Sequence, residues 1–343
     1  MLWNVRLESL TDRYSAIWNN HFPAAFEESR VEYTTIEGRD YGEIKTGDFL
    51  DVVGTNKFKA EQTLRIMELF NVNLVSNSDV FFFHDLWHPA LTSLLYIRDA
   101  LGMSFKIAGL LHAGAYCAGD MLARTKMVAW AKEIEAGWFS AGGVDLIFTA
   151  TEYHRNLVHA HYPSAKIAAQ WFPLWFEGVH SADAKENLIV FPHRLTPERR
   201  PVVFDEVRQI IEAKHGDWKC VCTHDLPDHS RPAYLATLAK AKIVVSTTMQ
   251  ETWGIAVQEA LVAGCRVVVP NAYAYPEYVP NDMLYPRHAT AAGIASHVEG
   301  AMTTFDTARS KTRVREAAEL VQLRGERAVE KMVGVMRAAK WTL

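Results

Sequence analysis

Residues 247–280 read TTMQETWGIAVQEALVAGCRVVVPNAYAYPEYVP. An apolar, β-rich run, KIVVST, ends at the first residue of this stretch. The GIAVQEALVAG portion that follows has apolar residues at helical spacing. We therefore expect a strand, a polar connection and then a helix that begins near Gly254 and ends at Gly264. Two carboxylates, Glu251 and Glu259, stand on either side of Gly254 at this junction.

The same alternation of β-rich runs and amphipathic helical stretches continues along the whole sequence. It is typical of parallel sheets covered by helices, and several runs are apolar throughout, as expected for strands buried on both faces. We predict an α/β protein with two Rossmann-like, doubly wound domains. The predicted strands lie at residues 2–7, 31–36, 79–85, 105–112, 146–151 and 165–172 in the first half, and at 187–192, 219–223, 242–247 and 266–270 in the second.

A chain of 343 residues exceeds what one hydrophobic core usually serves, which favours two domains. Proline, glycine and polar residues interrupt both periodicities in FPLWFEGVHSADAKEN, so we place the boundary near residues 178–187. The predicted domains are 1–180 and 181–320, and a C-terminal helix at 321–343 is expected to pack back on the first domain. Two such domains would face each other across a cleft, where open α/β sheets bind ligands.

The composition is that of an ordinary globular protein, with 49% hydrophobic and 22% charged residues. A net charge of -4 gives no global basic field for nucleic acid, although it allows a local basic patch. The first residues meet charge within a few positions, so we expect a cytoplasmic protein, with a phage-encoded protein acting in the host cytoplasm as one setting. The four cysteines lack zinc-site spacing, which favours buried free thiols.

The predicted helix start at Gly254 is a site for an anion. The first amides of a helix lack intrahelical partners and carry partial positive charge, and glycine lets a phosphate approach closely. Carboxylates accept hydrogen bonds from paired hydroxyls, so Glu251 and Glu259 indicate a ligand with diols on both sides of its phosphates. A nucleotide-sugar has this layout. The plainer alternative is that both glutamates are solvated surface residues.

Three arginines follow the first predicted strand of the second domain, in HRLTPERRP. Arg194, Arg199 and Arg200 would lie in one βα loop that opens at the same edge of the sheet as Gly254. Arginine suits bidentate contacts with phosphate and the charge of a departing diphosphate. We therefore favour a phosphate-binding role over a solvated surface.

These residues resemble the E-x7-E signature of retaining GT-B glycosyltransferases of family 4, through ETWGIAVQE, ALVAGCRVVVP and YPE. FPHRLTPERRP and VVSTTMQETWGIA are most similar to the queuosine-tRNA mannosyltransferase-like group, which glycosylates a modified base. The resemblance implies a GT-B fold, a UDP-sugar or GDP-sugar as donor, and transfer with retention in which the leaving phosphate takes the acceptor proton. No D-x-D metal signature stands out, so we expect transfer without a metal.

The resemblance also implies roles for particular residues. Glu259 would bind the ribose hydroxyls, and Glu251 the hydroxyls of the transferred sugar. His112, in LLHAGAYCAGD, would reach the donor sugar. The sugar and the diphosphate would further be held by the backbone of Thr252, Trp253, Gly254 and Ile255 and by the side chains of Arg194 and Arg199.

One stretch departs from the family pattern. Many relatives have a glycine-rich loop after the first strand, whereas this chain has LESLTDRYS, with no glycine. A close approach of that backbone to the donor is therefore in question. Arg13 or Tyr14 would supply a side-chain contact instead.

The acceptor is expected on the first domain. Asp85, in FFHDLWHPAL, would orient an acceptor hydroxyl or assist its deprotonation, and it would equally well cap the following helix. His154, His159 and His161 have no carboxylate or thiol partner at ligand spacing, so we expect surface histidines and no metal site.

Two basic stretches contain aromatic residues, a composition that suits phosphates and a displaced base but also a solvated helix face. With the resemblance, it favours a nucleic acid as acceptor, either hydroxymethylated pyrimidine in phage DNA or queuosine in tRNA. A small-molecule, lipid or polysaccharide acceptor stays open, as does a non-catalytic nucleotide-sugar-binding protein or an epimerase. The residues concerned are Lys57, Phe58, Lys59 and Arg65 in the first stretch and Arg124, Lys126 and Lys132 in the second.

Overall fold

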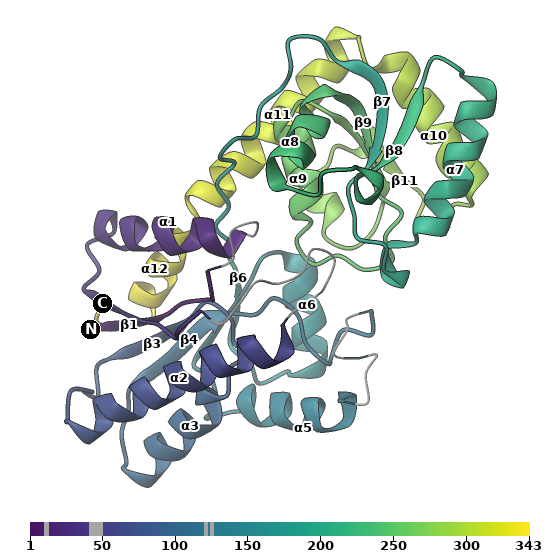
Figure 1. Ribbon diagram of the computed structural model, residues 1–343. Coiled ribbons are helices and arrows are strands. Elements are labelled where there is room, and N and C mark those ends of the chain that lie inside the picture. Colours follow the sequence, from purple (N-terminus) through teal and green to yellow (C-terminus); the bar gives the residue numbers. More distant parts are fainter. Residues whose placement is uncertain (10–13, 41–50, 120–122, 124–126) are drawn as a thin grey trace. The chain divides into compact units, whose positions relative to one another are not determined.

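The computed structural model describes residues 1–9, 14–40, 51–119, 123 and 127–343 (Figure 1). The chain divides into two compact units, each built on a parallel sheet. Unit 1 comprises Met1–Leu174 and Glu326–Leu343, and unit 2 comprises Trp175–Gly325. The chain thus leaves unit 1 a few residues before the predicted boundary region and returns to it at the end.

Within the described residues, the sheet of unit 1 has six parallel strands in the order β2-β1-β3-β4-β5-β6. Each of them lies within a run predicted from the sequence, so the six strand predictions for the first half are confirmed. The strands are β1 Leu2–Val5, β2 Tyr33–Ile36, β3 Val80–Phe83, β4 Lys106–Leu110, β5 Leu146–Thr149 and β6 Ile167–Ala169.

Helices cover both faces of this sheet. On one face, the core joins strand residues such as Trp3 and Phe81 to Ile66 of α2 and Leu94 of α3. On the other face, α1 packs Phe22 against Phe82, with ring centroids 6.0 Å apart, and the C-terminal helix α12 packs against α1 (Figure 1). The helices are α1 Tyr14–Glu28, α2 Val52–Asn71, α3 Ala90–Ala100, α5 Val128–Trp138, α6 Glu152–His161 and α12 Ala328–Ala338.

Unit 2 has a five-stranded parallel sheet in its described residues, in the order β11-β10-β9-β7-β8. Four of these strands were predicted, and the two-residue β11 was not. The strands are β7 Glu186–Phe191, β8 Lys219–Cys222, β9 Ala241–Val245, β10 Arg266–Pro270 and β11 Leu284–Tyr285. The helices are α7 Pro201–Lys214, α8 Arg231–Lys240, α9 Ile255–Val262, α10 Ala291–Thr304 and α11 Ala308–Glu326.

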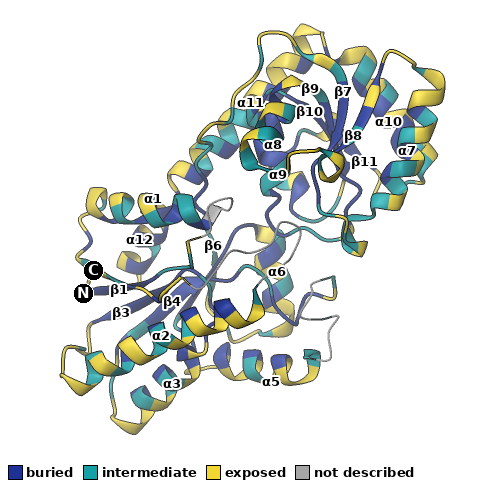
Figure 2. Cartoon of the chain, in the orientation of Figure 1, coloured by how far each residue is buried: buried dark blue, intermediate teal, exposed yellow. Residues whose placement is uncertain are grey.

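The sheet of unit 2 is also covered on both faces. Phe204 of α7 and Ile294 of α10 share a core with Ile243 of β9, whereas α8 and α9 contact each other, α8 also contacts β9 and α9 contacts β10. In both units the central strands are largely buried and the outer helix surfaces are exposed (Figure 2). The four cysteines are free and buried, as predicted.

The strand order fixes where a ligand can meet unit 2. Strands β7 and β9 are parallel neighbours, so the loops that follow them leave the same edge of the sheet. These loops carry Arg194 and Arg199 after β7, and Glu251 and Gly254 after β9. The loop that carries the arginines therefore opens at the same edge of the sheet as Gly254, as predicted.

Candidate functional site

Gly254 forms the junction between the loop after β9 and helix α9, as predicted. Its φ of 83° lies in the left-handed region, and a Cβ atom at this position would lie 2.3 Å from the Tyr278 hydroxyl oxygen. No side chain of the described residues caps α9. The first amides of the helix are therefore open to an anionic ligand. Glycine is needed at position 254 for the left-handed backbone and for the close approach of Tyr278.

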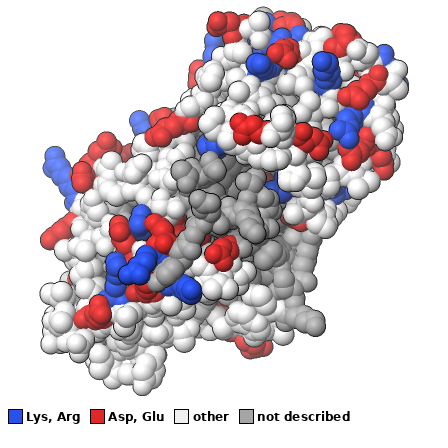
Figure 3. Space-filling view, viewed as in Figure 1, with Lys and Arg blue, Asp and Glu red and all other residues white. Residues whose placement is uncertain are grey.

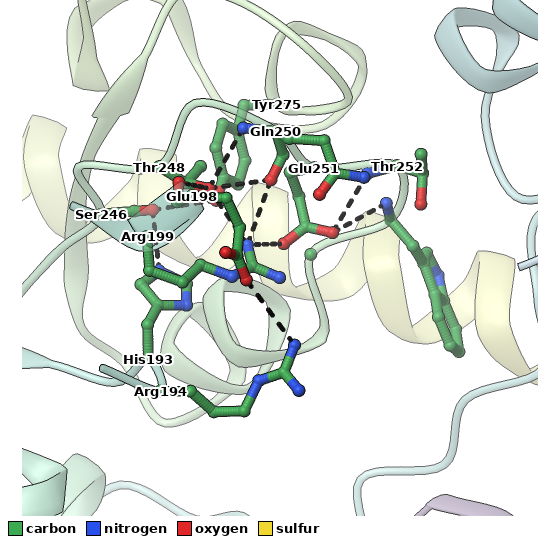
Figure 4. A network of polar contacts seen from close by, with 12 residues as sticks. His193, Arg194, Glu198, Arg199, Ser246, Thr248, Gln250, Glu251, Thr252 and Tyr275 are labelled. Carbon is green, nitrogen blue, oxygen red and sulfur yellow. Dashed lines mark hydrogen bonds and ion pairs between the residues drawn. The ribbon is translucent and has the colours of Figure 1, made fainter. Parts of the chain in front are cut away.

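The carboxylate of Glu251 is held from two sides (Figure 4). Its Oε2 atom accepts a hydrogen bond from Arg199 Nη1 at 2.7 Å, and its Oε1 atom accepts the amides of Thr252 at 3.1 Å and Trp253 at 3.2 Å. The side chain is only 12% exposed. A carboxylate has about four lone-pair sites, so Glu251 is fixed beside the start of α9 and still has capacity for a ligand hydroxyl.

Arg199 ties the loop after β7 to the loop after β9. Its Nη1 atom also donates to Thr248 Oγ1 and to the Gln250 carbonyl oxygen, each at 3.2 Å. Burial opposes the charge of the guanidinium, but the attraction of Glu251 prevails and raises the pKa of Arg199. The three bonds described for Arg199 all use Nη1, so Nη2 and Nε offer further donors to a phosphate.

The other two arginines of the loop have different places. Arg194 is 40% exposed, and its Nη2 atom lies 4.0 Å from Glu198 Oε1. Arg200 has a φ of 54° immediately before α7, and its carbonyl oxygen accepts a hydrogen bond from Thr247 Oγ1 at 3.0 Å. The structure therefore brings Arg199 to Glu251, leaves the Arg194 side chain accessible, and uses the Arg200 backbone in the turn.

Behind the Arg199–Glu251 pair runs a chain of buried polar side chains that we did not predict (Figure 4). His193 Nε2 lies 2.7 Å from Ser246 Oγ, which lies 3.0 Å from the Tyr275 hydroxyl oxygen. Burial lowers the pKa of His193 well below its ordinary value, and the arginine charges nearby add to this, so the ring is neutral at pH 7. The PHR and YPE motifs contain two of these residues, but only the packing shows that they meet at Ser246.

Glu259 lies inside α9 and is buried. Its Oε1 atom lies 2.7 Å from Arg231 Nη2, and its Oε2 atom accepts the Tyr234 hydroxyl at 2.8 Å. The alternative that Glu251 and Glu259 are solvated surface residues is therefore wrong for both. We did not predict Arg231 and Tyr234, which come from α8.

In unit 1, His112 follows β4 and is half-buried. Its Nε2 atom lies 2.8 Å from the carbonyl oxygen of His84, and its ring centroid lies 5.5 Å from that of Trp18 and 5.0 Å from that of Phe172. Burial lowers the pKa of His112, although the charge of Asp85 acts in the opposite direction. The ring is thus a neutral, well-packed group at the carboxyl end of β4.

Asp85 lies just after β3 and is paired with a lysine. Its Oδ2 atom accepts from Lys59 Nζ at 2.8 Å, and its Oδ1 atom accepts the Trp87 amide at 3.0 Å. Burial opposes the carboxylate charge, but Lys59 prevails and lowers the pKa of Asp85. The alternative that Asp85 caps the next helix is wrong, because the N-cap of α3 is Pro89 and the first amide of the helix, that of Ala90, donates to His88 Nδ1 at 3.1 Å.

The prediction of surface histidines is right for two of the three. His159 and His161 are exposed, but His154 is fully buried, and its Nε2 atom lies 2.5 Å from the Tyr116 hydroxyl oxygen. His154 and Val158 lie one helical turn apart on the buried face of α6, which explains the difference. No group of three or more His, Cys, Asp or Glu side chains in the described part of the chain is placed to hold a metal ion.

The two basic stretches are only partly available to a polyanion. Phe58 is in the core and Lys59 is paired with Asp85, whereas the exposed basic residues are Lys57, Arg65 and Lys132. Basic and acidic side chains are interspersed on the face seen in Figure 3. Arg13, Arg124 and Lys126 lie outside the described residues. None of the described helices is both long and apolar enough to cross a membrane.

Comparison with known proteins gives relatives by sequence and by fold. No family model matches the chain. The tRNA-queuosine alpha-mannosyltransferase of Drosophila melanogaster is 27% identical over a match that covers 35% of this chain and 41% of that protein. The match therefore spans less than half of the length of this relative.

The structural matches extend over more of the chain. Sucrose-phosphate synthase from Thermosynechococcus elongatus matches with a TM-score of 0.70 at 11% identity, over 98% of both chains. The pneumococcal O-GlcNAc transferase GtfA, solved in complex with UDP and GlcNAc, matches with a TM-score of 0.58 at 12% identity, over 82% of this chain and 60% of that one. The resemblance seen in the sequence is thus confirmed: the chain has the α/β GT-B fold and is similar to glycosyltransferases of the family 4 kind.

Proposed function

We propose that this protein is a retaining glycosyltransferase that moves a sugar from a nucleoside-diphosphate sugar to a hydroxyl acceptor. The observation that carries the proposal is the contact of 2.7 Å between Arg199 and Glu251 at the uncapped start of α9. A guanidinium for a diphosphate, a carboxylate for sugar hydroxyls and open helix amides meet there in two neighbouring loops. The sequence similarity to a tRNA-queuosine alpha-mannosyltransferase supports the same activity.

In this proposal, unit 2 binds the donor. The amides at the start of α9 and the side chains of Arg194 and Arg199 hold the diphosphate, and Glu251 accepts hydrogen bonds from the sugar. Because the amides of Thr252 and Trp253 already bond to Glu251, the phosphate contacts fall to Gly254 and Ile255. Glu259 accepts the ribose hydroxyls. A UDP-sugar or a GDP-sugar fits these contacts equally well.

The chemistry follows from charge development. Breaking the bond between sugar and phosphate gives an oxocarbenium-like transition state, and negative charge grows on the departing diphosphate. Arg199 is already held in place by its three acceptors, so its remaining donors need little reorganisation to stabilise that charge. One such donor typically lowers the free-energy barrier by about 3 kcal/mol. The leaving phosphate takes the acceptor proton, and no protein nucleophile or metal ion is required.

Two residues of unit 1 have proposed roles beside the reacting sugar. His112, neutral and held by the His84 carbonyl, would contact the donor sugar. Asp85 has a lowered pKa and is paired with Lys59, so it suits orientation of an acceptor hydroxyl better than removal of its proton.

The acceptor we propose is a hydroxyl on a modified nucleic-acid base, either queuosine in tRNA or hydroxymethylpyrimidine in DNA. The support is the relative that acts on tRNA-queuosine, together with the exposed Lys57, Arg65 and Lys132 of unit 1. A base inside a helix would have to be flipped out to reach the donor. A small-molecule, lipid or polysaccharide acceptor is the alternative that the test must separate.

The test is incubation of the purified protein with UDP-sugars and GDP-sugars and with either total tRNA or hydroxymethylated DNA. Nucleosides from the digested product are then analysed by mass spectrometry. The expected result is the mass increase of one sugar on one modified nucleoside, with release of free nucleoside diphosphate only when the acceptor is present.

One control variant and two contrary outcomes decide how the result is interpreted. Glu251→Gln keeps the shape of the side chain but should abolish the mass increase. If nucleoside diphosphate is released with a small hydroxyl acceptor but not with nucleic acid, the acceptor is a small molecule, lipid or polysaccharide and not a nucleic acid. Binding of nucleotide-sugar without release under any condition would identify a binding protein and overturn the proposal.

A further inference from the structure

Helix α8 brings two hydrogen-bond donors to Glu259. Arg231 Nη2 lies 2.7 Å from one carboxylate oxygen, and the Tyr234 hydroxyl donates to the other at 2.8 Å. The two donors are three residues apart and therefore lie on the same face of α8. The Glu259 side chain is 5% exposed, whereas that of Arg231 is 24% exposed. The carboxylate is thus held from one side by α8 within a mostly buried site.

These two bonds leave half of the acceptor capacity of Glu259 unused. An ionised carboxylate has about four lone-pair sites, and α8 occupies one site on each oxygen. One site on each oxygen is left, which matches two adjacent hydroxyls of a ribose. Burial and the charge of Glu259 raise the pKa of Tyr234 well above its ordinary value, so its hydroxyl stays a donor at working pH.

The segment before α8 fixes the position of these donors. Asp228 accepts the Ser230 amide at 2.8 Å and the Ser230 hydroxyl at 2.9 Å, and Ser230 Oγ accepts the Ala233 amide at 3.3 Å as the cap of α8. Pro232 restricts the backbone in the first turn. Arg231 and Tyr234 therefore project from a helix start with little conformational freedom, as a positioning role requires.

We propose that Arg231 and Tyr234 are positioning residues that aim Glu259 at the ribose of the nucleotide, and that they thereby make the site select ribonucleotides over deoxyribonucleotides. The proposal rests on the proposed function, because it needs a nucleotide bound at α9. If Arg231 and Tyr234 only balanced the buried charge of Glu259, removing either donor would weaken the binding of every nucleotide to the same degree. A positioning role instead changes affinity only for nucleotides that carry the hydroxyls.

The experiment measures dissociation constants by calorimetry for UDP, GDP, 2′-deoxy-UDP and 3′-deoxy-UDP with the full chain. The variants are Tyr234→Phe and Arg231→Lys. Tyr162→Phe is the matched control for the first, because the Tyr162 hydroxyl donates to a glutamate, Glu135, in unit 1 at 2.6 Å. Arg208→Lys is the control for the second, because Arg208 pairs with Asp205 on the surface of unit 2.

We expect the wild type to prefer UDP over its deoxy analogues, and Tyr234→Phe to weaken UDP binding by about tenfold while changing the analogues by less than about twofold. Arg231→Lys should raise the KM for the donor and leave kcat nearly unchanged. If GDP binds more tightly than UDP, the same comparison is made between GDP and its 2′-deoxy and 3′-deoxy analogues. The two control variants should keep the wild-type preference.

Two results would overturn the inference. The first is a wild type that binds UDP and its deoxy analogues equally well. The second is a Tyr234→Phe variant in which all these nucleotides weaken together, which would assign α8 a purely structural role. Failure of the wild type to bind either UDP or GDP is a different result, because it removes the proposed function itself. Thermal unfolding of each variant separates loss of fold from loss of selectivity.

Discussion

Replacing Gly254 with alanine tests the helix start on which the candidate site is built. Gly254 has a φ of 83°, and an alanine in the left-handed region costs about 1–2 kcal/mol. Its Cβ would also meet the Tyr278 hydroxyl oxygen at 2.3 Å, and Tyr278 is buried, so it cannot simply turn away. Overpacking of this kind costs about 1–3 kcal/mol. We therefore expect Gly254→Ala to lower the free energy of unfolding by about 2–5 kcal/mol in total.

Gly142 provides a matched control. Its φ of 87° is almost the same, but no atom lies within 4 Å of the position that a Cβ would take. Gly142→Ala should therefore show the backbone cost alone, about 1–2 kcal/mol, and no change in nucleotide affinity. Adding Tyr278→Phe to Gly254→Ala should recover part of the steric cost, since the nearest atom is the Tyr278 hydroxyl oxygen.

The assay combines urea unfolding with calorimetric titration of UDP and GDP. Gly254→Ala should bind nucleotide at least about tenfold more weakly than the wild type, because a shift of the backbone moves the amides at the start of α9. Equal losses of stability in Gly254→Ala and Gly142→Ala would show that the contact with Tyr278 is not as tight as described. Wild-type nucleotide affinity in Gly254→Ala would refute the placement of the diphosphate at this helix.

Three further predictions concern charge. Glu251→Gln should lower kcat by about a hundredfold or more while the protein stays folded, and steady-state rates together with circular dichroism check both parts. Asp85→Asn should lower the rate of transfer without changing the dissociation constant for UDP, since we propose that Asp85 orients the acceptor; a change in UDP affinity would contradict this proposal. Burial lowers the pKa of His84 to about 3, below the ordinary 6.5, so the unfolded chain binds one more proton there and stability is lost as pH falls from 6.5 towards 3. Between pH 7 and pH 5 the wild type should therefore lose about 2 kcal/mol more than His84→Phe in urea unfolding, and parallel losses would show that His84 is not the group responsible.

Much of the fold could be predicted because the strands are nearly continuous apolar runs. Runs such as VFFF in β3 and RVVVP in β10 are buried along their whole length, which is the signal that parallel strands leave in a sequence. Strand β11 has only Leu284 and Tyr285, too few residues for any period to show. The burial of His154 was missed for another reason. Histidine side chains usually lie on the surface, and only the spacing of His154 from Val158 indicated that it lies on the buried face of α6.

The candidate site was predictable where its residues are close in sequence. Glu251, Gly254 and Glu259 are spaced by one loop and one helix, so a local pattern was enough to find them. The partners of Glu259 are 28 and 25 residues away, at Arg231 and Tyr234, and the contact exists only because α8 packs against α9. Helix-to-helix contacts of this kind depend on tertiary packing, which no short motif records.

Unit 1 is made of two pieces of chain, since Met1–Leu174 is joined by Glu326–Leu343. Helix α12 in the second piece buries Val329, Met332, Val333 and Met336, and Arg337 donates to the carbonyl oxygen of Ser29 at 2.8 Å. During translation, α1 therefore lacks its packing partner α12 until all of unit 2 has been synthesised. A premature stop codon after residue 325 would leave unit 2 whole but uncover an apolar face of unit 1, and such a product should be a target for chaperones or proteases.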